Sequence, residues 1–244
     1  MSKSEPKTMP VEKSPAKGAK GGRSGSGASP VRERSARRGN TRDPESTSAA
    51  ILAAAVREFT ERGYEGARVD NIASRAGVNK RMLYHYFGNK QALYVAVLEG
   101  TYTAIRSAEH GLHLIDRDPV EGMTDLVQFT WRYYLAHPEF LSLLNTENLH
   151  RAKFLKRSAR IFELNSPLIE RISALLERGV EQGVFRGDLD ALKVYVSIAA
   201  LGFFYLSNRW TLSTVFRRDL TAKEEIEAWG QHMVDVTLSF LRRP

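Results

Sequence analysis

From residue 43 onward, apolar residues recur at intervals of three and four, the spacing that places them on one face of an α-helix. The first such stripe comprises Ile51, Leu52, Ala55, Val56 and Phe59. No stretch alternates apolar and polar residues over the length of a strand, and no Asn-Gly hairpin turn occurs. The sequence therefore predicts an all-α protein.

Capping residues divide this pattern into separate helices. Asp43, Pro44 and Glu45 suit the start of the first helix, and Gly63 suits its end, with Tyr64 folding back against it. Short helices are predicted over residues 69–76 and 80–87. Further helices are predicted after Asn89, over residues 119–136, after Pro138, around 152–164, from Ser166 to about Gln182, after Asp190 and from Thr221.

The composition excludes several classes of protein. There is no cysteine, which rules out disulfide frameworks, thiolate catalysis and sulfur-based zinc sites. The basic N-terminus is followed by no apolar segment of the kind found in secretory signals. The longest apolar run, residues 194–206, is interrupted by Ser197 and is shorter than the roughly 20 residues of a membrane span. We therefore expect a cytoplasmic protein without a membrane partner.

The net charge of +8 is confined to the N-terminal tail. Residues 1–42 contain 11 Lys and Arg against 3 Glu, and the rest of the chain is neutral. This tail is rich in Lys, Arg, Ser, Gly, Ala and Pro, so it is predicted to be disordered. It serves either as a cationic arm that contacts DNA phosphates or as a solubilising leader. The folded part is not identified as a DNA-binding protein by its overall charge.

The segment SRAGVNKRMLYHYFGNK, residues 74–90, has the pattern of a helix-turn-helix. Gly77 supplies the positive φ of the turn, and Asn79 caps the second helix so that its positive end is open to anions. On that helix Leu83 and Phe87 share the inward face, and Arg81 lies on the opposite face. The remaining candidates on its outer surface are Lys80, Met82, Tyr84, His85 and Tyr86.

Such a surface suits the major groove of DNA, because Arg can contact guanine, Met a thymine methyl and Tyr a phosphate. A solvated charged face with two core aromatics would give the same spacing. His85 as a catalytic base has no nucleophile or carboxylate at a recognisable spacing. His110 and His113 could bind a metal as an i, i+3 pair, but no third ligand is near in the sequence.

Residues 51–98 resemble the DNA-binding domain of TetR-family transcriptional repressors. The matching features are the aromatic-x-x-x-Gly-Tyr end of the first helix, Ile-Ala-x-x-Ala-Gly-Val, Leu-Tyr-x-Tyr-Phe and Lys-x-x-Leu. The resemblance implies a homodimer whose recognition helices enter successive major grooves, and a C-terminal domain that binds an effector. It assigns DNA contacts to Lys80, Arg81, Met82, Tyr84, His85, Tyr86 and Lys90. Asn79 is a further candidate, because it caps the helix whose positive end is open to anions.

One departure from the family pattern concerns the start of the second helix. Family members usually carry Thr or Ser before the Val that opens it, as helix cap and phosphate contact. Here the residues are Ala67 and Arg68. Arg68 could still reach phosphate as a longer, charged contact.

Two C-terminal helices carry more apolar surface than one helical face requires. The segment 192–210 is apolar nearly all round, and the last helix has a 3-4-3-4 apolar stripe. A partner subunit would cover both in a four-helix interface; otherwise both belong to the core of a monomer. The residues assigned to this interface are Leu201, Phe204, Ile226, Trp229, Met233, Val236 and Phe240.

An effector pocket is predicted where polar groups interrupt apolar helices near aromatic side chains. The candidates are Trp131, Tyr134, Asn145, Asn148, His150, Phe154, Phe203, Tyr205 and Asn208. The alternative for each Asn is a capping or bridging role between helices. Neither a cofactor nor a metal is predicted.

These features predict three segments: a basic tail at 1–42, a helix-turn-helix domain at 43–98, and an effector-binding and dimerisation domain at 99–244. The predicted function is a sequence-specific regulator, most simply a homodimeric repressor that a small molecule releases from a palindromic operator. Two alternatives are an architectural DNA-coating protein that uses the tail, and a helical enzyme that uses a C-terminal cavity. No acid–base or nucleophile constellation supports the enzyme.

Overall fold

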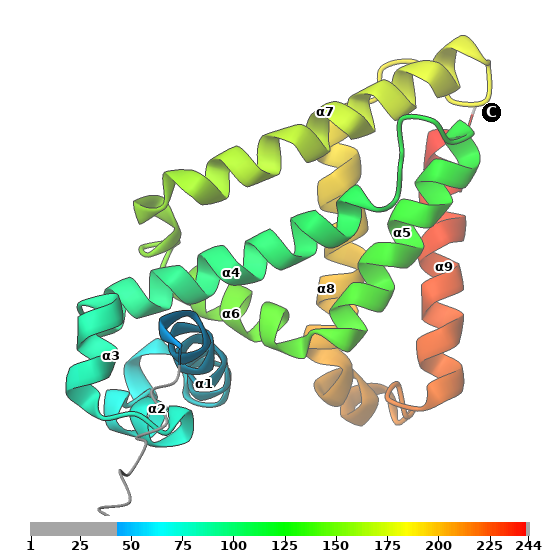
Figure 1. The fold of residues 1–244 in the computed structure, drawn as a ribbon. Helices are drawn as coiled ribbons and strands as arrows, with labels where there is room; N and C mark the ends of the chain where they lie inside the picture. Colours follow the sequence, from blue (N-terminus) through cyan, green and yellow to red (C-terminus); the bar gives the residue numbers. More distant parts are fainter. Residues whose placement is uncertain (1–42, 243–244) are drawn as a thin grey trace, which may run out of the picture. The chain divides into compact units, whose positions relative to one another are not determined.

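The computed structural model describes residues 43–242, apart from the side chains of Asn165 and Ser166. The basic tail at residues 1–42, with its predicted disorder and DNA contacts, lies outside the described residues. The helices in chain order are α1 (Pro44–Gly66), α2 (Val69–Ala76), α3 (Lys80–Phe87), α4 (Lys90–His110), α5 (Pro119–Ala136), α6 (Pro138–Leu149), the 3₁₀ turn η1 (Leu155–Arg157), α7 (Ala159–Glu181), α8 (Ala191–Phe216) and α9 (Lys223–Leu241) (Figure 1).

The all-α prediction is confirmed. Within residues 43–242 the only β-type pairing is an isolated bridge between Phe185 and Arg242. The predicted bounds of α2, α3 and α5 match those observed. Gly63 has φ +63° and kinks α1, and helical hydrogen bonding resumes for three further residues to Gly66. Asp43 occupies the N-cap position, but its side chain makes no capping bond.

One long helix, α4, runs from α3 toward the C-terminal helices (Figure 1). Its first half contributes Leu93, Tyr94, Val97 and Leu98 to a core that it shares with α1, α2 and α3. Its second half contributes Ile105 to a core built with α5, α7, α8 and α9. The helix-turn-helix domain is therefore connected to the C-terminal helices by a continuous rod and not by a linker.

The prediction of two helices, around 152–164 and from Ser166 to about Gln182, is wrong: residues Leu155–Arg157 form a 3₁₀ turn, and Ala159–Glu181 form the single helix α7. The helix does not begin at Ser166; it begins at Ala159, after Ser158, whose Oγ accepts a hydrogen bond from the Ile161 amide at 3.3 Å. Pro167 lies inside the helix, where it removes one backbone hydrogen bond. A Ser-Pro pair resembles a helix start, but apolar contacts on both sides of it keep one helix continuous: Ile161, Leu168 and Ile172 are all buried.

The 26-residue α8 is long and apolar enough, by length and composition alone, to cross a membrane. The apolar run predicted to be too short for a membrane span, residues 194–206, is only the middle part of this helix. Only 28% of its most apolar window is buried, and Phe204, Trp210 and Phe216 are among its exposed side chains. The fold of one chain thus leaves much of α8 uncovered.

Helices α5 and α9 approach each other closely because Gly230 of α9 faces Trp131 of α5. A Cβ atom built at Gly230 would lie 2.6 Å from Cδ1 of the Trp131 ring. Trp131 is 5% exposed and also packs at 5.7 Å against the ring of Tyr205 from α8. The indole therefore has little room to move away.

Replacing this glycine should destabilise the C-terminal core. Gly230→Ala is expected to lower the free energy of unfolding by about 1–3 kcal/mol, the usual cost of overpacking a well-filled core. Urea denaturation at fixed protein concentration measures the change. Gly100→Ala is the matched control, because a Cβ at this helical position has no neighbour within 4 Å. It should raise stability by about 0.5–1 kcal/mol; equal losses at both positions would contradict the packing argument.

Candidate DNA-binding surface, effector site and subunit interface

The turn between α2 and α3 has the geometry that its sequence requires. Gly77 adopts the left-handed conformation, with φ 66° and ψ 33°, which residues with a Cβ rarely adopt. Asn79 caps α3, and its Oδ1 accepts a hydrogen bond from the Met82 amide at 2.8 Å. Both predictions are confirmed. The remaining amides of the first turn of α3 are available to an anion.

The missing Thr or Ser cap of α2 is replaced by a buried carboxylate from α1. Glu58 is 0% exposed, and its Oε1 accepts hydrogen bonds from the Arg68 amide at 3.2 Å and from Asn71 Nδ2 at 2.9 Å. Arg75 Nη2 lies 3.4 Å from Oε2 of the same carboxylate. Glu58 thus supplies the cap at the start of α2. The Arg68 side chain is exposed, and it makes no hydrogen bond or ion pair with the groups that the structure describes.

Helix α3 presents a continuous exposed surface opposite a single buried anchor. Leu83 is 0% exposed and points into the N-terminal core. Arg81 and His85 are exposed, and Met82 and Tyr84 are 40% and 38% exposed. The four side chains predicted to contact base edges and phosphates thus share the outer surface of one short helix.

Three other predicted DNA contacts have partners within the chain. Lys80 Nζ lies 3.0 Å from Asp70 of α2, and this hydrogen-bonded carboxylate raises the pKa of the lysine. Lys90 donates to the Glu65 carbonyl at 3.4 Å. Tyr86 is half-buried and packs against the N-terminal core. Each lysine ammonium has two further N–H donors that remain available for a phosphate.

The predicted effector pocket is not assembled as a unit. Asn145 and Asn148 are exposed on α6. Phe154 is 1% exposed and packs at 4.2 Å against the ring of Tyr64 and at 5.0 Å against that of Tyr94, inside the N-terminal core. His150 lies at the edge of the same aromatic group. These four residues belong to the junction between α6 and the helix-turn-helix domain.

Four more of the predicted pocket residues serve the helix packing of the C-terminal core. Trp131 fills the α5–α9 contact described above. Tyr205 is 3% exposed, and its hydroxyl donates to the Leu220 carbonyl at 2.8 Å. Asn208 Nδ2 donates to the Phe204 carbonyl at 2.8 Å within α8. Phe203 is half-buried against the core. The Asn208 amide thus bonds within its own helix, and only Tyr134 remains from the predicted set.

A buried polar cluster surrounds Tyr134 and was not predicted. It contains Tyr102, Arg106 and Glu109 of α4, Tyr134 of α5 and Tyr195 of α8. Arg106 and Glu109 are 6% and 2% exposed, and Arg106 Nη1 lies 2.7 Å from Glu109 Oε2. Arg106 Nη2 donates to the Tyr195 hydroxyl at 3.0 Å. Three helices thus bring one guanidinium, one carboxylate and three phenols together in the C-terminal core.

Burial raises the pKa values of the carboxyl and phenol groups in this cluster. Desolvation raises the pKa of Glu109 to about 7, although the guanidinium groups of Arg106 and Arg171 act in the opposite direction. Desolvation also raises the pKa of Tyr102 to about 12 and moves the pKa of Tyr134 upward. The phenols therefore stay neutral and can donate hydrogen bonds near pH 7.

A sequence signal for the cluster was present. Tyr102, Arg106 and Glu109 follow one another at steps of four and three, and they continue the apolar stripe that includes Leu98 and Ile105. Charged residues at the positions where a helix faces its core are costly unless they are paired. Arg106 and Glu109 therefore indicate a specific buried polar interaction.

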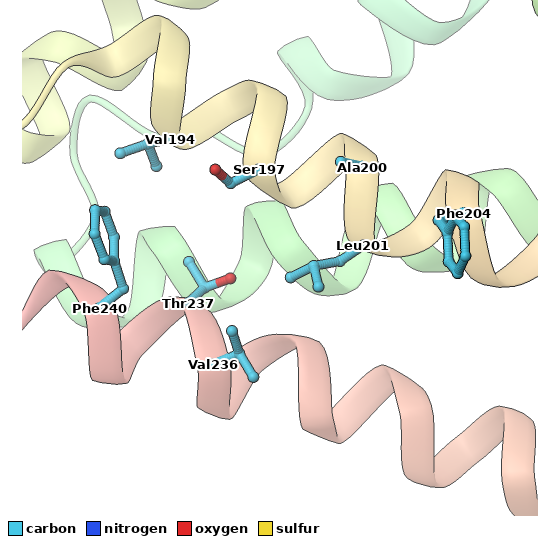
Figure 2. Close-up of a pocket in the computed structure, with 8 residues that line it drawn as sticks. All are labelled: Val194, Ser197, Ala200, Leu201, Phe204, Val236, Thr237 and Phe240. Carbon is cyan, nitrogen blue, oxygen red and sulfur yellow. The ribbon is translucent and has the colours of Figure 1, made fainter.

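Helices α8 and α9 enclose an apolar groove of about 490 Å³ on the surface of the C-terminal domain. Figure 2 shows side chains from both helices directed toward the space between them. The lining residues are Val194, Ser197, Ala200, Leu201, Phe204, Val236, Thr237 and Phe240.

Four of the residues assigned to a subunit interface line this groove, namely Leu201, Phe204, Val236 and Phe240. Met233 does not, because it is 0% exposed and packs into the core of its own chain. Trp229 stacks on Tyr205 at 4.5 Å, and its Nε1 donates to the Leu201 carbonyl at 3.3 Å. Ile226 is half-buried against the same core. The apolar stripe of α9 thus packs partly on its own chain and is partly exposed.

The histidine pair considered as a metal site does not acquire further ligands. His110 ends α4, and His113 follows in the loop with φ +46°. In the part of the chain that the structure describes, no three His, Cys, Asp or Glu side chains gather as a metal site would require.

Comparisons with known proteins match both domains. The family described as "Bacterial regulatory proteins, tetR family" matches residues 51–97, and "Tetracyclin repressor-like, C-terminal domain" matches residues 119–237. The chain is 39% identical over 193 residues to the HTH-type transcriptional repressor NicS of Pseudomonas putida, which covers 79% of this chain and 91% of that protein. It is 28% identical over 164 residues to the repressor AcnR of Corynebacterium glutamicum, covering 66% of this chain and 81% of that protein.

A solved structure shares the fold. The ketosteroid transcriptional regulator KstR2 of Mycobacterium tuberculosis superposes with a TM-score of 0.61 at 22% identity, over 81% of this chain and 95% of that one. These matched proteins are transcriptional regulators and not enzymes. The chain therefore belongs to the TetR family, and it is a helix-turn-helix, DNA-binding transcriptional regulator.

Proposed function

We propose that the protein is a homodimeric repressor that binds a palindromic operator in the bacterial cytoplasm and is released from it by a small-molecule effector. The observation that carries this proposal is the exposed surface of α3, held outward by buried Leu83. Repression would follow from occupation of a promoter. In a dimer the two copies of α3 would enter major grooves about 34–36 Å apart, or a multiple of this spacing.

The DNA contacts would divide between bases and phosphates. Arg81 has the donors to contact guanine, and Met82 can touch a thymine methyl. Tyr84 and Arg68 are exposed and suit phosphate contacts. Asn79 would hold the first turn of α3 in place at the groove.

The groove between α8 and α9 supports the dimer. Phe204 is 58% exposed and Phe240 is 51% exposed, both beside an apolar groove. Large apolar side chains gathered in one exposed patch usually indicate an interaction surface. A second copy of the same face would give a four-helix interface and would also cover the uncovered side of α8.

The continuity of α4 supports coupling between an effector and DNA. Asn89, which caps α4, is separated from the end of α3 by Gly88 alone, and Arg106 is buried near the other end of the same helix. A ligand that favours another position of α4 would shift the population of dimers toward one whose recognition helices do not match the two grooves.

The α3 surface can be tested on a site selected from a random duplex library. The double variant Arg81→Ala, Tyr84→Ala should lose affinity for that site by about 100-fold or more, since each contact of this kind contributes about 1–3 kcal/mol. Fluorescence anisotropy at constant salt measures the affinity. Circular dichroism and sedimentation should show unchanged folding and dimerisation.

Arg132→Ala is the matched control, because this arginine is also exposed but lies on α5. It should bind the selected site like the wild type. A double variant with wild-type affinity and an unchanged footprint would remove α3 from the DNA interface.

The dimer interface can be tested by charge. Phe204→Glu combined with Phe240→Glu should yield a folded monomer, because association would bury four carboxylates in apolar surroundings. Analytical ultracentrifugation measures the mass of the particle in solution and so distinguishes monomer from dimer. The affinity for the full palindrome should fall when the protein is monomeric.

Leu149→Glu provides the control for added surface charge, since Leu149 is 81% exposed and lies on α6. This variant should remain a dimer. If the double variant also remains dimeric at micromolar concentration, the subunits associate through another face.

A further inference from the structure

The buried Arg106 side chain has more hydrogen-bond donors than partners. A guanidinium has five N–H donors, and here Nη2 donates to Tyr195 while Nη1 faces Glu109. Nε has no hydrogen-bond acceptor among the described residues, although the residue is only 6% exposed. The polar partner of Glu109 Oε2 is Nη1 of Arg106. Buried donors are normally satisfied, so Nε leaves the cluster with hydrogen-bonding capacity for a further partner.

The charges near the cluster do not balance. Arg106 from α4 and Arg171 from α7 both act on the single carboxylate of Glu109. Arg171 is half-buried, and its Nε also has no hydrogen-bond partner. Because burial raises the pKa of Glu109 to about 7, part of the population has this acid protonated at neutral pH. One or two positive charges are then uncompensated, which favours a small anion.

Neutral donors and aromatic rings complete the surroundings. The hydroxyls of Tyr102 and Tyr134 make no hydrogen bond with the groups that the structure describes, which leave out the side chains of Asn165 and Ser166, and both phenols are neutral at pH 7. The rings of these two tyrosines pack against Phe140 with centroids 5.6 Å and 5.8 Å away. A ligand there would meet a guanidinium at one end and apolar aromatic surface at the other.

We propose that the effector is a small organic carboxylate with an apolar body, which pairs with Arg106 in place of Glu109. A carboxylate matches the planar guanidinium through two parallel hydrogen bonds, and the phenols can donate to its outer lone pairs. Its body would pack on Phe140 and the tyrosine rings. This inference rests on the proposed function, since it names the ligand class of the regulator.

Displacement of Glu109 explains how such a ligand would act on α4. The ion pair joins residues one turn apart near the C-terminal end of the helix, and Arg106 also bonds to α8 through Tyr195. Moving the Glu109 carboxylate changes how α4 is held against α5, α7 and α8. Tyr102, one turn earlier, packs against both the C-terminal and the N-terminal core, so the change reaches the helix-turn-helix domain.

Isothermal titration of the full chain without DNA tests the ligand class. The probes are benzoate, phenylacetate and 4-methylvalerate, each compared with its neutral amide. At least one acid should bind the wild type tenfold or more tightly than its amide. Glu109→Gln should bind that acid more tightly than the wild type does, because the competing carboxylate is gone.

The double variant Arg106→Gln, Glu109→Gln removes both members of the ion pair together, so neither is left buried without the other. It should keep its fold by circular dichroism but lose the preference for the acid over the amide. Arg132→Gln, an exposed arginine on α5, is the matched control and should keep that preference. The proposal is overturned if no acid exceeds its amide in either the wild type or Glu109→Gln, or if the neutral double variant retains the preference.

Operator binding separates this outcome from a failure of the proposed function. Ligand binding is measured without DNA, and affinity for the selected site is measured without ligand. Loss of acid selectivity with intact operator binding would contradict only the ligand class. Acid binding by a chain that selects no DNA sequence would contradict the repressor.

Discussion

The burial of one continuous helix in two cores is the constraint on which the rest of the structure depends. The N-terminal half of α4 packs Leu93 and Leu98 beneath α1 to α3, and its C-terminal half packs Ile105 among α5, α7, α8 and α9. The 21-residue helix spans about 30 Å. Because interiors are closely packed, neither core can shift α4 without disturbing the other. A regulator built this way needs no flexible hinge to connect a ligand with DNA.

Buried carboxylates organise the parts of the chain that helices alone leave unsupported. Glu58 accepts the backbone amide at the start of α2, in place of the usual hydroxyl cap. Glu147, 1% exposed on α6, accepts the amides of Phe154 and Leu155 and so fixes the loop before α7. Glu58 also lies near a guanidinium, that of Arg75, but Glu109 differs from both acids because it accepts no backbone amide among the described residues and its ion-pair partner is Arg106. This difference sets Glu109 apart from the structural acids and supports its place in a ligand site.

Local sequence signals predicted the elements whose stability is local. The caps Asn79, Asn89 and Asp190 are side chains within three residues of the backbone amides they satisfy. The predicted start of α7 is wrong because Ser166-Pro167 resembles a helix cap, whereas apolar packing on both sides of this pair keeps the helix continuous from Ala159. The predicted pocket residues are not brought together for a related reason: Phe154 and Trp131 have the composition of a ligand wall, but the core that an aromatic ring enters depends on distant helices.

The sequence by itself determined the helical class, the helix-turn-helix and the outward surface of α3, since each depends on contacts within one or two turns of helix. Only the tertiary structure showed that Glu58 caps α2 from another helix, that Met233 packs into its own chain while Phe240 remains exposed, and that Arg106 meets Tyr195 across 89 positions of sequence. These pairings depend on how whole helices pack. The residues next to a given residue in the sequence do not determine which helix packs against it in the folded chain.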